Sequence, residues 1–499
     1  MVPFDFSNLS PQVVWQHFQT LCTIPRPSKH EQQLREFLRN WAESRNLETY
    51  VDEVGNLIIR KNATAGKEHV SGIILQGHLD MVTQANTGTV HDFFKDPICP
   101  VLEDGWLIAK DTTLGADNGI GVALALAVLD SNDIAHGPIE VLLTVDEEAG
   151  MSGARLLQAG VLKGKWLFNI DTEEWGELYL GCAGSIDVEV EQPLSYEPLP
   201  ENLTVVNIQV AGLKGGHSGV DIHLGRGNAN VILARFLNQY LGSLGGHLVE
   251  FTGGTARNAL PREAVATIAI SSNQLPELEK LLAEYQAVWK NQLQGIDDNL
   301  RLTIQPTSVE VTEVIAQQQQ NEWLQALATS PYGVANMSQA LPDVVETSNN
   351  IGVVRLNREG GKAVLMVRSM VNQEAQDFAE KIHAHFSQFN ITSTLTPLVS
   401  GWTPNPDSAA LKCLQQAYQN AFNIEPNLKV IHAGLECGII AEHYPHLQMV
   451  SFGPDIQGAH APGERVKVDT VEKCWKLLVT ALEMMDIDSI YAHQIHFIS

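Results

Sequence analysis

The chain has 499 residues, more than one hydrophobic core usually holds, so two or more domains are expected. Its 58 acidic residues outnumber its 32 basic residues, and the net charge of −26 argues against nucleic acid and anionic membrane as partners. The N-terminus lacks signal-peptide features, the apolar run 120–129 is too short to span a bilayer, and six cysteines without a CxxC pair form no disulfide framework, which together predict a cytoplasmic protein.

Two helices are predicted in the first 45 residues. Ser10 and Pro11 are residue types that favour the cap and the first turn of a helix at 12–22. The segment SKHE, Ser28 to Glu31, matches a capping box in front of a second helix. From there to residue 174, buried apolar strands alternate with helices, which predicts an α/β layered domain.

The sequence pattern changes near residue 187. The segment 188–203 contains three prolines and is predicted to be a linker, and amphipathic strands interleaved with helices follow it up to residue 395. After a second proline-rich segment at 396–408, the helix–strand alternation resumes. The predicted organisation is an α/β domain made of residues 1–186 and 400–499, with an inserted α+β domain at 187–399.

Histidine and acidic residues gather after the predicted strands, where open α/β sheets carry their sites. The chain has neither a GxxxxGK[ST] phosphate loop nor a GxSxG nucleophile elbow. A mixed histidine and carboxylate set favours zinc or a similar divalent ion, and five ligands with one shared carboxylate suffice for two ions. Seven residues form this set, of which five would be ligands, while Asp80 and Glu147 fit a supporting role and a base role: His78, Asp80, Asp117, Glu147, Glu148, Asp171 and His460.

Each of these residues, taken alone, also has a structural interpretation. Asp117 could cap the helix that follows it, and Glu147 with Glu148 could be a solvated strand end. A single histidine such as His78 or His460 is more often structural than metal-bound. Only the joint occurrence favours a metal site.

The chain resembles, in five phrases and in their order, the co-catalytic zinc aminopeptidase, aminoacylase and desuccinylase superfamily: GHLDMV, DTTLGADNGIGVALALAVL, TVDEEAGMSGA, NIDTEE and GAHAPGERV. Within it, the chain is similar to the peptidase D family of bacterial dipeptidases in the phrases IPRPSKHE, GGHSGVDIHLGRGNAN, ETSNNIGVV and VRSMV. The resemblance implies a zinc-peptidase catalytic domain, with a mixed sheet flanked by helices, and an inserted α+β lid domain.

The resemblance also implies two zinc ions per subunit. His78 and Asp171 would hold one ion, Glu148 and His460 the other, and Asp117 would bridge them. The same ligand types accept cobalt or manganese, so zinc is inferred from ligand type and abundance.

Two further residues receive catalytic roles from the resemblance. Asp80 would orient the imidazole of His78, and Glu147 would be the general base for a metal-activated water. The predicted function is metal-dependent hydrolysis of dipeptides of broad specificity, including those that end in histidine.

The lid domain would contribute substrate contacts. His217 would reach the scissile carbonyl oxygen and stabilise an oxyanion. Arg368, with Asn258, would grip a free carboxylate, although without the resemblance Arg368 would be interpreted as a solvated charge at a strand edge. His432 and Glu436 would contact the substrate.

Two other functional classes share much of this pattern. A deacylase or desuccinylase of N-acyl amino acids would have the same metal ligands and a different lid pocket. A scaffold without catalysis would have lost ligands, and none is lost here. The resemblance leaves open whether His217 acts within one chain or across a homodimer.

Overall fold

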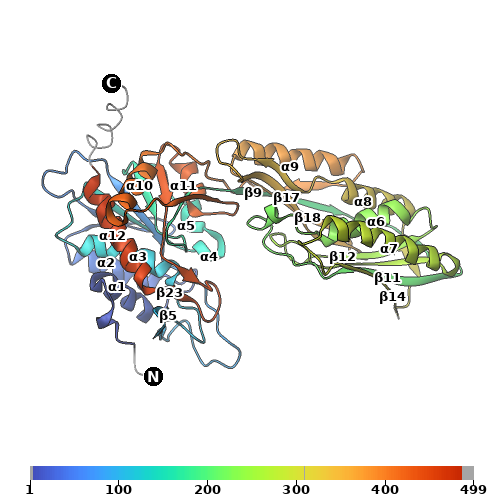
Figure 1. The fold of residues 1–499 in the computed structure, drawn as a ribbon, viewed down its shortest axis with the longest axis horizontal. Helices are drawn as coiled ribbons and strands as arrows, with labels where there is room; N and C mark the ends of the chain where they lie inside the picture. Colours follow the sequence, from blue (N-terminus) through green and yellow to red (C-terminus); the bar gives the residue numbers. More distant parts are fainter. Residues whose placement is uncertain (1–3, 308, 486–499) are drawn as a thin grey trace. The chain divides into compact units, whose positions relative to one another are not determined.

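The computed structural model describes residues 4–307 and 309–485 (Figure 1). Residues 1–3, 308 and 486–499, which fall inside the predicted domain ranges, lie outside the described residues. The chain divides into two compact units. The first comprises Met1–Gly181, Trp402–Val430 and Leu435–Ser499, and the second comprises Cys182–Gly401 and Ile431–Gly434.

An eight-stranded mixed sheet forms the centre of the first unit, in the order β1-β2-β6-β3-β7-β21-β8-β20. Neighbours among β6, β3, β7 and β21 are parallel, so their carboxyl ends meet at one edge of the sheet. Strands β3, β6 and β7 are buried along their whole length, as expected for parallel strands covered on both faces. The strands are β1 (Glu48–Val51), β2 (Leu57–Lys61), β3 (Ile73–His78), β6 (Ile139–Thr144), β7 (Trp166–Asn169), β8 (Glu177–Cys182), β20 (Asn427–Ile431) and β21 (Gln448–Ser451).

Helices and a small sheet complete the first unit. Helix α3 is buried from Asn118 to Leu129 and apolar around its circumference, so it is an internal helix. Among the residues described, none of the helices has the length and apolar character needed to cross a membrane. The elements are η1 (Phe6–Asn8), α1 (Gln12–Thr23), α2 (Gln32–Glu43), α3 (Ala116–Asp130), α4 (Glu147–Gly150), α5 (Ser152–Arg155), α10 (Ala409–Phe422), α11 (Glu436–His443), α12 (Val468–Met484), and the four-stranded sheet of β4 (Val101–Glu103), β5 (Trp106–Ile108), β22 (Ile456–Gln457) and β23 (Arg465–Lys467).

Both predicted helix caps near the N-terminus are wrong. Pro11, not Ser10, is the N-cap of α1, and no side chain in the described part of the chain caps that helix. The capping box before α2 does not form: Glu31 itself is the N-cap, and its carboxylate accepts the N–H of Lys29 at 3.0 Å rather than that of Ser28. The Ser28 hydroxyl donates to Asp80 at 2.7 Å, and the Glu31 carboxylate accepts the N–H of Asp146 at 2.8 Å.

The second unit contains a nine-stranded sheet, in the order β14-β11-β13-β12-β17-β18-β9-β19 with β16 beside β17, and every recorded pairing in it is antiparallel. Helices α6 to α9 lie along one face of this sheet (Figure 1). The strands are β9 (Gly184–Gln192), β11 (Leu203–Ala211), β12 (His247–Gly253), β13 (Ala264–Ser271), β14 (Arg301–Pro306), β16 (Gly333–Met337), β17 (Val345–Asn357), β18 (Gly360–Ser369) and β19 (Ser393–Leu395). A two-stranded sheet of β10 (Tyr196–Pro198) and β15 (Glu313–Ile315) and the helices η2 (Ile222–Leu224), α6 (Ala229–Tyr240), η3 (Ser272–Gln274), α7 (Leu275–Gln292), α8 (Gln317–Thr329) and α9 (Asn372–Ser387) complete it.

The predicted linker at 188–203 is partly wrong, because β9 extends to Gln192. Val188 and Val190 are buried while Glu189 and Glu191 are exposed, which is the period-two pattern of a strand with one buried face. The prolines begin only after this strand. The predicted fold class, an α/β unit with a mixed sheet and a separate unit built on an antiparallel sheet, is confirmed.

Candidate metal centre

The five predicted metal ligands lie together at the carboxyl edge of the first unit's sheet. The Nε2 atom of His78, the last residue of β3, lies 3.1 Å from Asp117 Oδ1 and 3.5 Å from Asp171 Oδ1. The Nε2 atom of His460 lies 3.1 Å from Asp117 Oδ2 and 3.1 Å from Glu148 Oε2. Asp117 therefore presents one carboxylate oxygen to each histidine.

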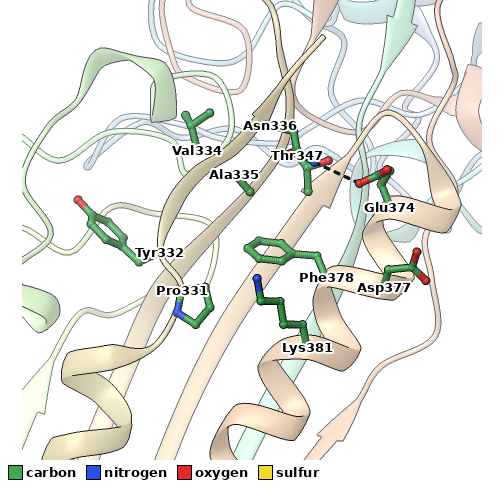
Figure 2. A pocket seen from close by; sticks show the side chains of 10 residues that line it. All are labelled: Pro331, Tyr332, Val334, Ala335, Asn336, Thr347, Glu374, Asp377, Phe378 and Lys381. Atoms are coloured by element: carbon green, nitrogen blue, oxygen red, sulfur yellow. Dashed lines mark hydrogen bonds between the residues drawn. The ribbon is translucent and has the colours of Figure 1, made fainter. Parts of the chain in front are cut away.

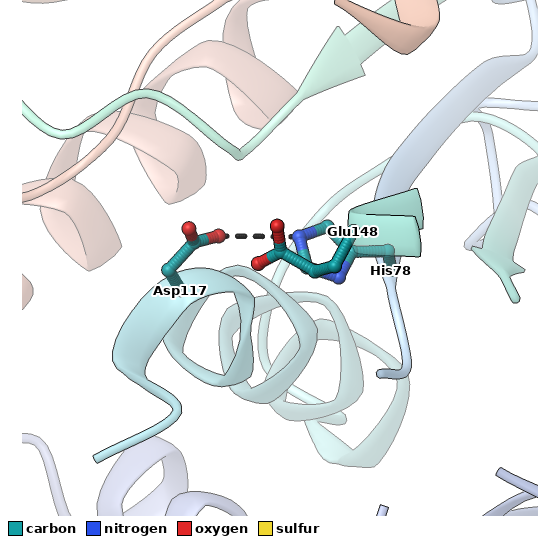
Figure 3. Close-up of side chains that lie close together, drawn as sticks. All are labelled: His78, Asp117 and Glu148. Carbon is teal, nitrogen blue, oxygen red and sulfur yellow. Dashed lines mark hydrogen bonds and ion pairs between the residues drawn. The ribbon is translucent and has the colours of Figure 1, made fainter. Parts of the chain in front are cut away.

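The donor set has the chemistry of a cation site. His78, Asp117 and Glu148 each offer a ligand atom, and these atoms lie within 4.8 Å of one another (Figure 3). The Glu148 Oε1 atom is buried and lacks a hydrogen-bond partner among the described residues. Buried carboxylate oxygens are costly when unpaired, so this arrangement fits a divalent cation. Asp117 does not cap α3, because the N-cap is Gly115 and no side chain accepts there.

In this arrangement the positive charge of the protonated imidazoles balances the negative charge of the surrounding carboxylates. Burial opposes charge on His78, but the carboxylates around it, Asp171 foremost, raise its pKa well above the usual range. Hydrogen bonds to Asp117 and Glu148 raise the pKa of His460 to about 11. A metal ion would replace these protons, so its binding is coupled to proton release.

Asp80 connects the imidazole of His78 to the helix that carries the paired glutamates. Its Oδ1 atom lies 3.3 Å from His78 Nδ1 and accepts the N–H of Glu147 at 3.0 Å. Its Oδ2 atom accepts the N–H of Glu148 at 3.1 Å and the Ser28 hydroxyl at 2.7 Å. Burial opposes ionisation, but these hydrogen bonds prevail and lower the pKa of Asp80 to about 2.

Glu147 lies at the start of α4, and its carboxylate is near the cluster without being as close as the ligands. Its Oε2 atom is 3.9 Å from His78 Nε2. Burial raises the pKa of the Glu147 carboxyl well above its usual range, and neighbouring carboxylates raise it further. A carboxyl whose pKa is raised is suited to exchange protons with a reacting group.

Asn118 is a site residue that the sequence interpretation missed. Its Oδ1 atom accepts the N–H of His78 at 3.1 Å, and its amide donates to the Ile170 carbonyl at 2.5 Å. A Cβ atom at Gly77 would overlap Asn118 Oδ1, so glycine within β3 makes room for this contact. The signal in the sequence was the position of an asparagine directly after Asp117.

Glu436 is buried between the strands rather than on a surface. Its Oε2 atom accepts hydrogen bonds from Gln76 of β3 at 2.7 Å and from Thr144 of β6 at 2.8 Å. Burial raises its pKa to about 7. Its predicted contact with the substrate stays a prediction.

The histidine predicted for the lid has a defined tautomer. His217, in the second unit, accepts the N–H groups of Gly219 at 3.1 Å and Val220 at 3.0 Å on its Nδ1 atom. Burial and the positive charge of Arg368 lower the pKa of His217. The ring is therefore neutral and carries its proton on Nε2, where it is free to donate.

The other predicted lid residues lie near His217 within the second unit. The carbonyl of Asn258 accepts the N–H of Ser218 at 2.8 Å. A Cβ atom at Gly219 would overlap the carbonyl of His432 and lie 2.9 Å from the Arg368 side chain, which places these two residues beside the same loop.

Arg368 and His432 are both deeply buried. Arg368 is 5% exposed, so its interpretation as a solvated charge is wrong. Burial lowers the pKa of Arg368 to about 10, and burial together with the charge of Arg368 lowers that of His432 to about 3. Arg368 Nε and His432 Nδ1 are buried and have no hydrogen-bond partner among the described residues.

The second unit also contains a hollow of about 450 Å³ between β16 and α9 (Figure 2). Glu374 of α9 accepts a hydrogen bond from Asn336 of β16 at 3.2 Å. None of the predicted site residues lines this hollow, and it is not part of the metal centre. Its lining consists of Pro331, Tyr332, Val334, Ala335, Asn336, Thr347, Glu374, Asp377, Phe378 and Lys381.

The fold and the site are those of a metallopeptidase, a hydrolase of peptide bonds. Residues 74–484 match the family described as Peptidase family M20/M25/M40. The chain is 42% identical over 479 residues to the cytosol non-specific dipeptidase of Escherichia coli (strain K12), covering 96% of this chain and 99% of that protein. The chain belongs to the M20/M25/M40 peptidase family, and the resemblance inferred from the sequence is confirmed.

Solved structures agree with this assignment. The crystal structure of aminoacylhistidine dipeptidase from Vibrio alginolyticus has a TM-score of 0.92 and 42% sequence identity, and the match covers 97% of this chain and 98% of that chain. An aminopeptidase from Bacillus cereus has a TM-score of 0.55 at 17% identity, with 95% and 98% coverage, and shares the fold.

Proposed function

We propose that this protein is a metal-dependent dipeptidase that hydrolyses unblocked dipeptides of many sequences, including those that end in histidine. The observation that carries the proposal is the position of Asp117, with one oxygen toward His78 and the other toward His460. The near full-length similarity to a non-specific dipeptidase and to an aminoacylhistidine dipeptidase supports the substrate class. The first unit is then the catalytic domain and the second the lid, as in the predicted ranges 1–186 with 400–499 and 187–399.

Two divalent ions complete the proposed site. His78 and Asp171 would hold one ion, Glu148 and His460 the other, and Asp117 both. Nitrogen and carboxylate donors suit zinc, and cobalt or manganese fits the same set. When bound, such an ion pair supplies Lewis-acid activation of a water molecule and of the peptide carbonyl.

The proton is carried by Glu147. Its carboxylate takes a proton from the attacking water and returns it to the departing amine, so it must stay outside the ligand set. Asp80 holds the N–H groups of Glu147 and Glu148 on its two oxygens and thereby fixes the start of α4 against the imidazole of His78.

The lid side chains recognise the rest of the substrate. The Nε2–H of His217 donates to the carbonyl oxygen as negative charge develops there. The guanidinium of Arg368, with Asn258, binds the free carboxylate of the dipeptide. His432 and Glu436 complete the substrate contacts. Acidic groups of the metal centre would hold the free amine of the dipeptide. Binding both the free amine and the free carboxylate limits the substrate to two residues and leaves side chains loosely selected.

Replacing His217 by alanine is expected to lower kcat on the order of 10²–10³-fold, with a smaller rise in KM, because the donated hydrogen bond is strongest in the transition state. Steady-state kinetics on an unblocked dipeptide measure both constants. The matched control is His223→Ala, which removes an exposed histidine from the neighbouring η2 and should leave both constants near wild type. An unchanged kcat in His217→Ala would refute the oxyanion role.

A comparison of three substrates tests the dipeptidase proposal against the deacylase alternative. A free dipeptide should be hydrolysed faster than its C-terminal amide and than its N-acetyl form. Arg368→Ala should raise KM for the dipeptide and change little for the amide, which has no carboxylate to bind. If the N-acetyl form is the best substrate, the protein is a deacylase instead.

The location and the assembly belong to the same proposal. The name of the Escherichia coli relative supports a cytoplasmic enzyme. The resemblance further suggests a homodimer, and neither nucleic acid nor membrane is expected as a partner, given the net charge of −26. Sedimentation of the purified protein would measure the subunit number, and a monomer would exclude action of His217 across subunits.

A further inference from the structure

A buried arginine connects two of the loops that form the metal centre. Arg26 is 2% exposed and donates from Nη1 to the carbonyls of Leu79 at 3.0 Å and Asp80 at 3.1 Å. From Nη2 it donates to the carbonyl of Gly115 at 2.6 Å. The first two carbonyls directly follow His78, and the third lies two residues before Asp117. One guanidinium therefore ties the turn of one metal ligand to the turn of another.

A buried glutamate binds the backbone N–H groups of the same turn whose carbonyl Arg26 binds. Glu464 is 1% exposed, and its Oε1 atom accepts the N–H groups of Leu114 at 2.7 Å and Gly115 at 2.8 Å. Its Oε2 atom accepts the N–H of Asp117 at 3.2 Å. Gly115 thus gives its carbonyl to Arg26 and its N–H to Glu464, and the turn has little freedom to move.

The sequence leaves space for the guanidinium at two glycines. Gly115 has a φ of 73°, and a Cβ atom there would lie 2.5 Å from Arg26 Nη2. A Cβ atom at Gly119, one turn into α3, would lie 2.8 Å from the same nitrogen. Any larger residue at either position would displace the guanidinium.

We propose that Arg26 is a positioning residue for the metal centre. It fixes the separation of His78 and Asp117, while Glu464 fixes the orientation of the Asp117 turn. The inference rests on the proposed function, because it takes His78 and Asp117 as metal ligands. The planar guanidinium reaches three carbonyls from two nitrogens, whereas a lysine ammonium carries the same charge on a single nitrogen and cannot span them.

The test is Arg26→Lys, which keeps the positive charge and removes the planar guanidinium with its two terminal nitrogens. Loaded with Co²⁺, the variant should show a shifted d–d absorption spectrum and bind the ion about 10–100-fold more weakly in competition with a chelator, as is typical when a partner that orients the ligands is lost. Its kcat for a dipeptide should fall by a similar factor, with KM near wild type.

Arg355 is a matched control. It donates to the carbonyls of Gly253 at 2.8 Å, Val354 at 2.7 Å and Gly254 at 2.6 Å, so it also spans three carbonyls, but in the second unit. Arg355→Lys should lose the same kind of contacts and keep the wild-type cobalt spectrum and affinity. Equal changes in both variants would mean that Arg26 is structural only, and would overturn the proposal.

Glu464→Gln keeps the test decisive if Arg26→Lys does not fold. The amide would place an N–H group against one of the backbone N–H groups that the carboxylate accepts, so the same spectral shift and loss of affinity are expected. A wild-type spectrum in a folded Glu464→Gln or Arg26→Lys protein would overturn the positioning role and leave the proposed function intact. Failure of the wild-type protein to bind Co²⁺ at all would overturn both.

Discussion

Replacing Glu147 by glutamine is expected to lower kcat about 10²–10⁴-fold while the protein keeps its bound metal. Glutamine has the same shape, and the backbone N–H of residue 147 would still donate to Asp80. What the variant loses is the ability to take a proton from water and to pass it to the leaving amine. Steady-state kinetics and elemental analysis on the same preparation measure the two quantities.

The neighbouring glutamate is the matched control. Glu148→Gln should lose metal, because Glu148 Oε2 lies 3.1 Å from His460 Nε2 and its second oxygen is buried without a partner among the described residues. Near-normal turnover in Glu147→Gln would show that Glu147 is not the general base. Metal loss in Glu147→Gln with retention in Glu148→Gln would mean that the two roles are exchanged.

Replacing Asp117 by alanine should remove both metal ions and reduce hydrolysis by at least about 10⁴-fold, beyond the range that a single proton-transfer group supplies. The physical reason is that Asp117 faces His78 with one oxygen and His460 with the other. Among the described residues, no other carboxylate contacts both histidines. Elemental analysis after gel filtration counts the ions that stay bound.

Asp130 provides the control on the same helix. It lies at the last position of α3 and pairs with Arg45 at 2.7 Å and His17 at 3.3 Å. Asp130→Ala should keep both ions and nearly normal kinetics, because Asp130 lies at the opposite end of α3 from Asp117; the loss of its two ion pairs should lower only the stability. Two tightly bound ions in Asp117→Ala would contradict the bridge.

Periodicity and composition were sufficient to predict the layered architecture. Continuous apolar runs at β3, β6 and β7 reflect burial on both faces, and the alternating pattern of strands such as β11 reflects one covered face. Both patterns are local, because each records the environment of neighbouring positions on one element. The linker at 188–203 was predicted too long because the proline signal outweighed the alternation in β9.

The helix starts near the N-terminus show the limit of local patterns. Ser28 and Glu31 have the spacing of a capping box, yet they bind Asp80 and the N–H of Asp146, residues 52 and 115 positions away. A short-range motif specifies which groups can form hydrogen bonds, and the fold decides which partner is nearest. The same two side chains thereby stabilise the edge of the metal centre rather than α2.

The sequence by itself determined the identity of the candidate ligands, because the chemistry of histidine and carboxylate side chains is independent of the fold. Only the tertiary structure decided their arrangement: the two-sided contact of Asp117 and the part played by Asn118 join segments tens to hundreds of residues apart. The hydrogen bonds of Arg26 to the turns after His78 and before Asp117 could likewise not be predicted from the sequence. Such contacts depend on distances between residues that are far apart in the sequence. The fold sets these distances when it brings distant segments together at the edge of the sheet, and a local sequence pattern carries no information about them.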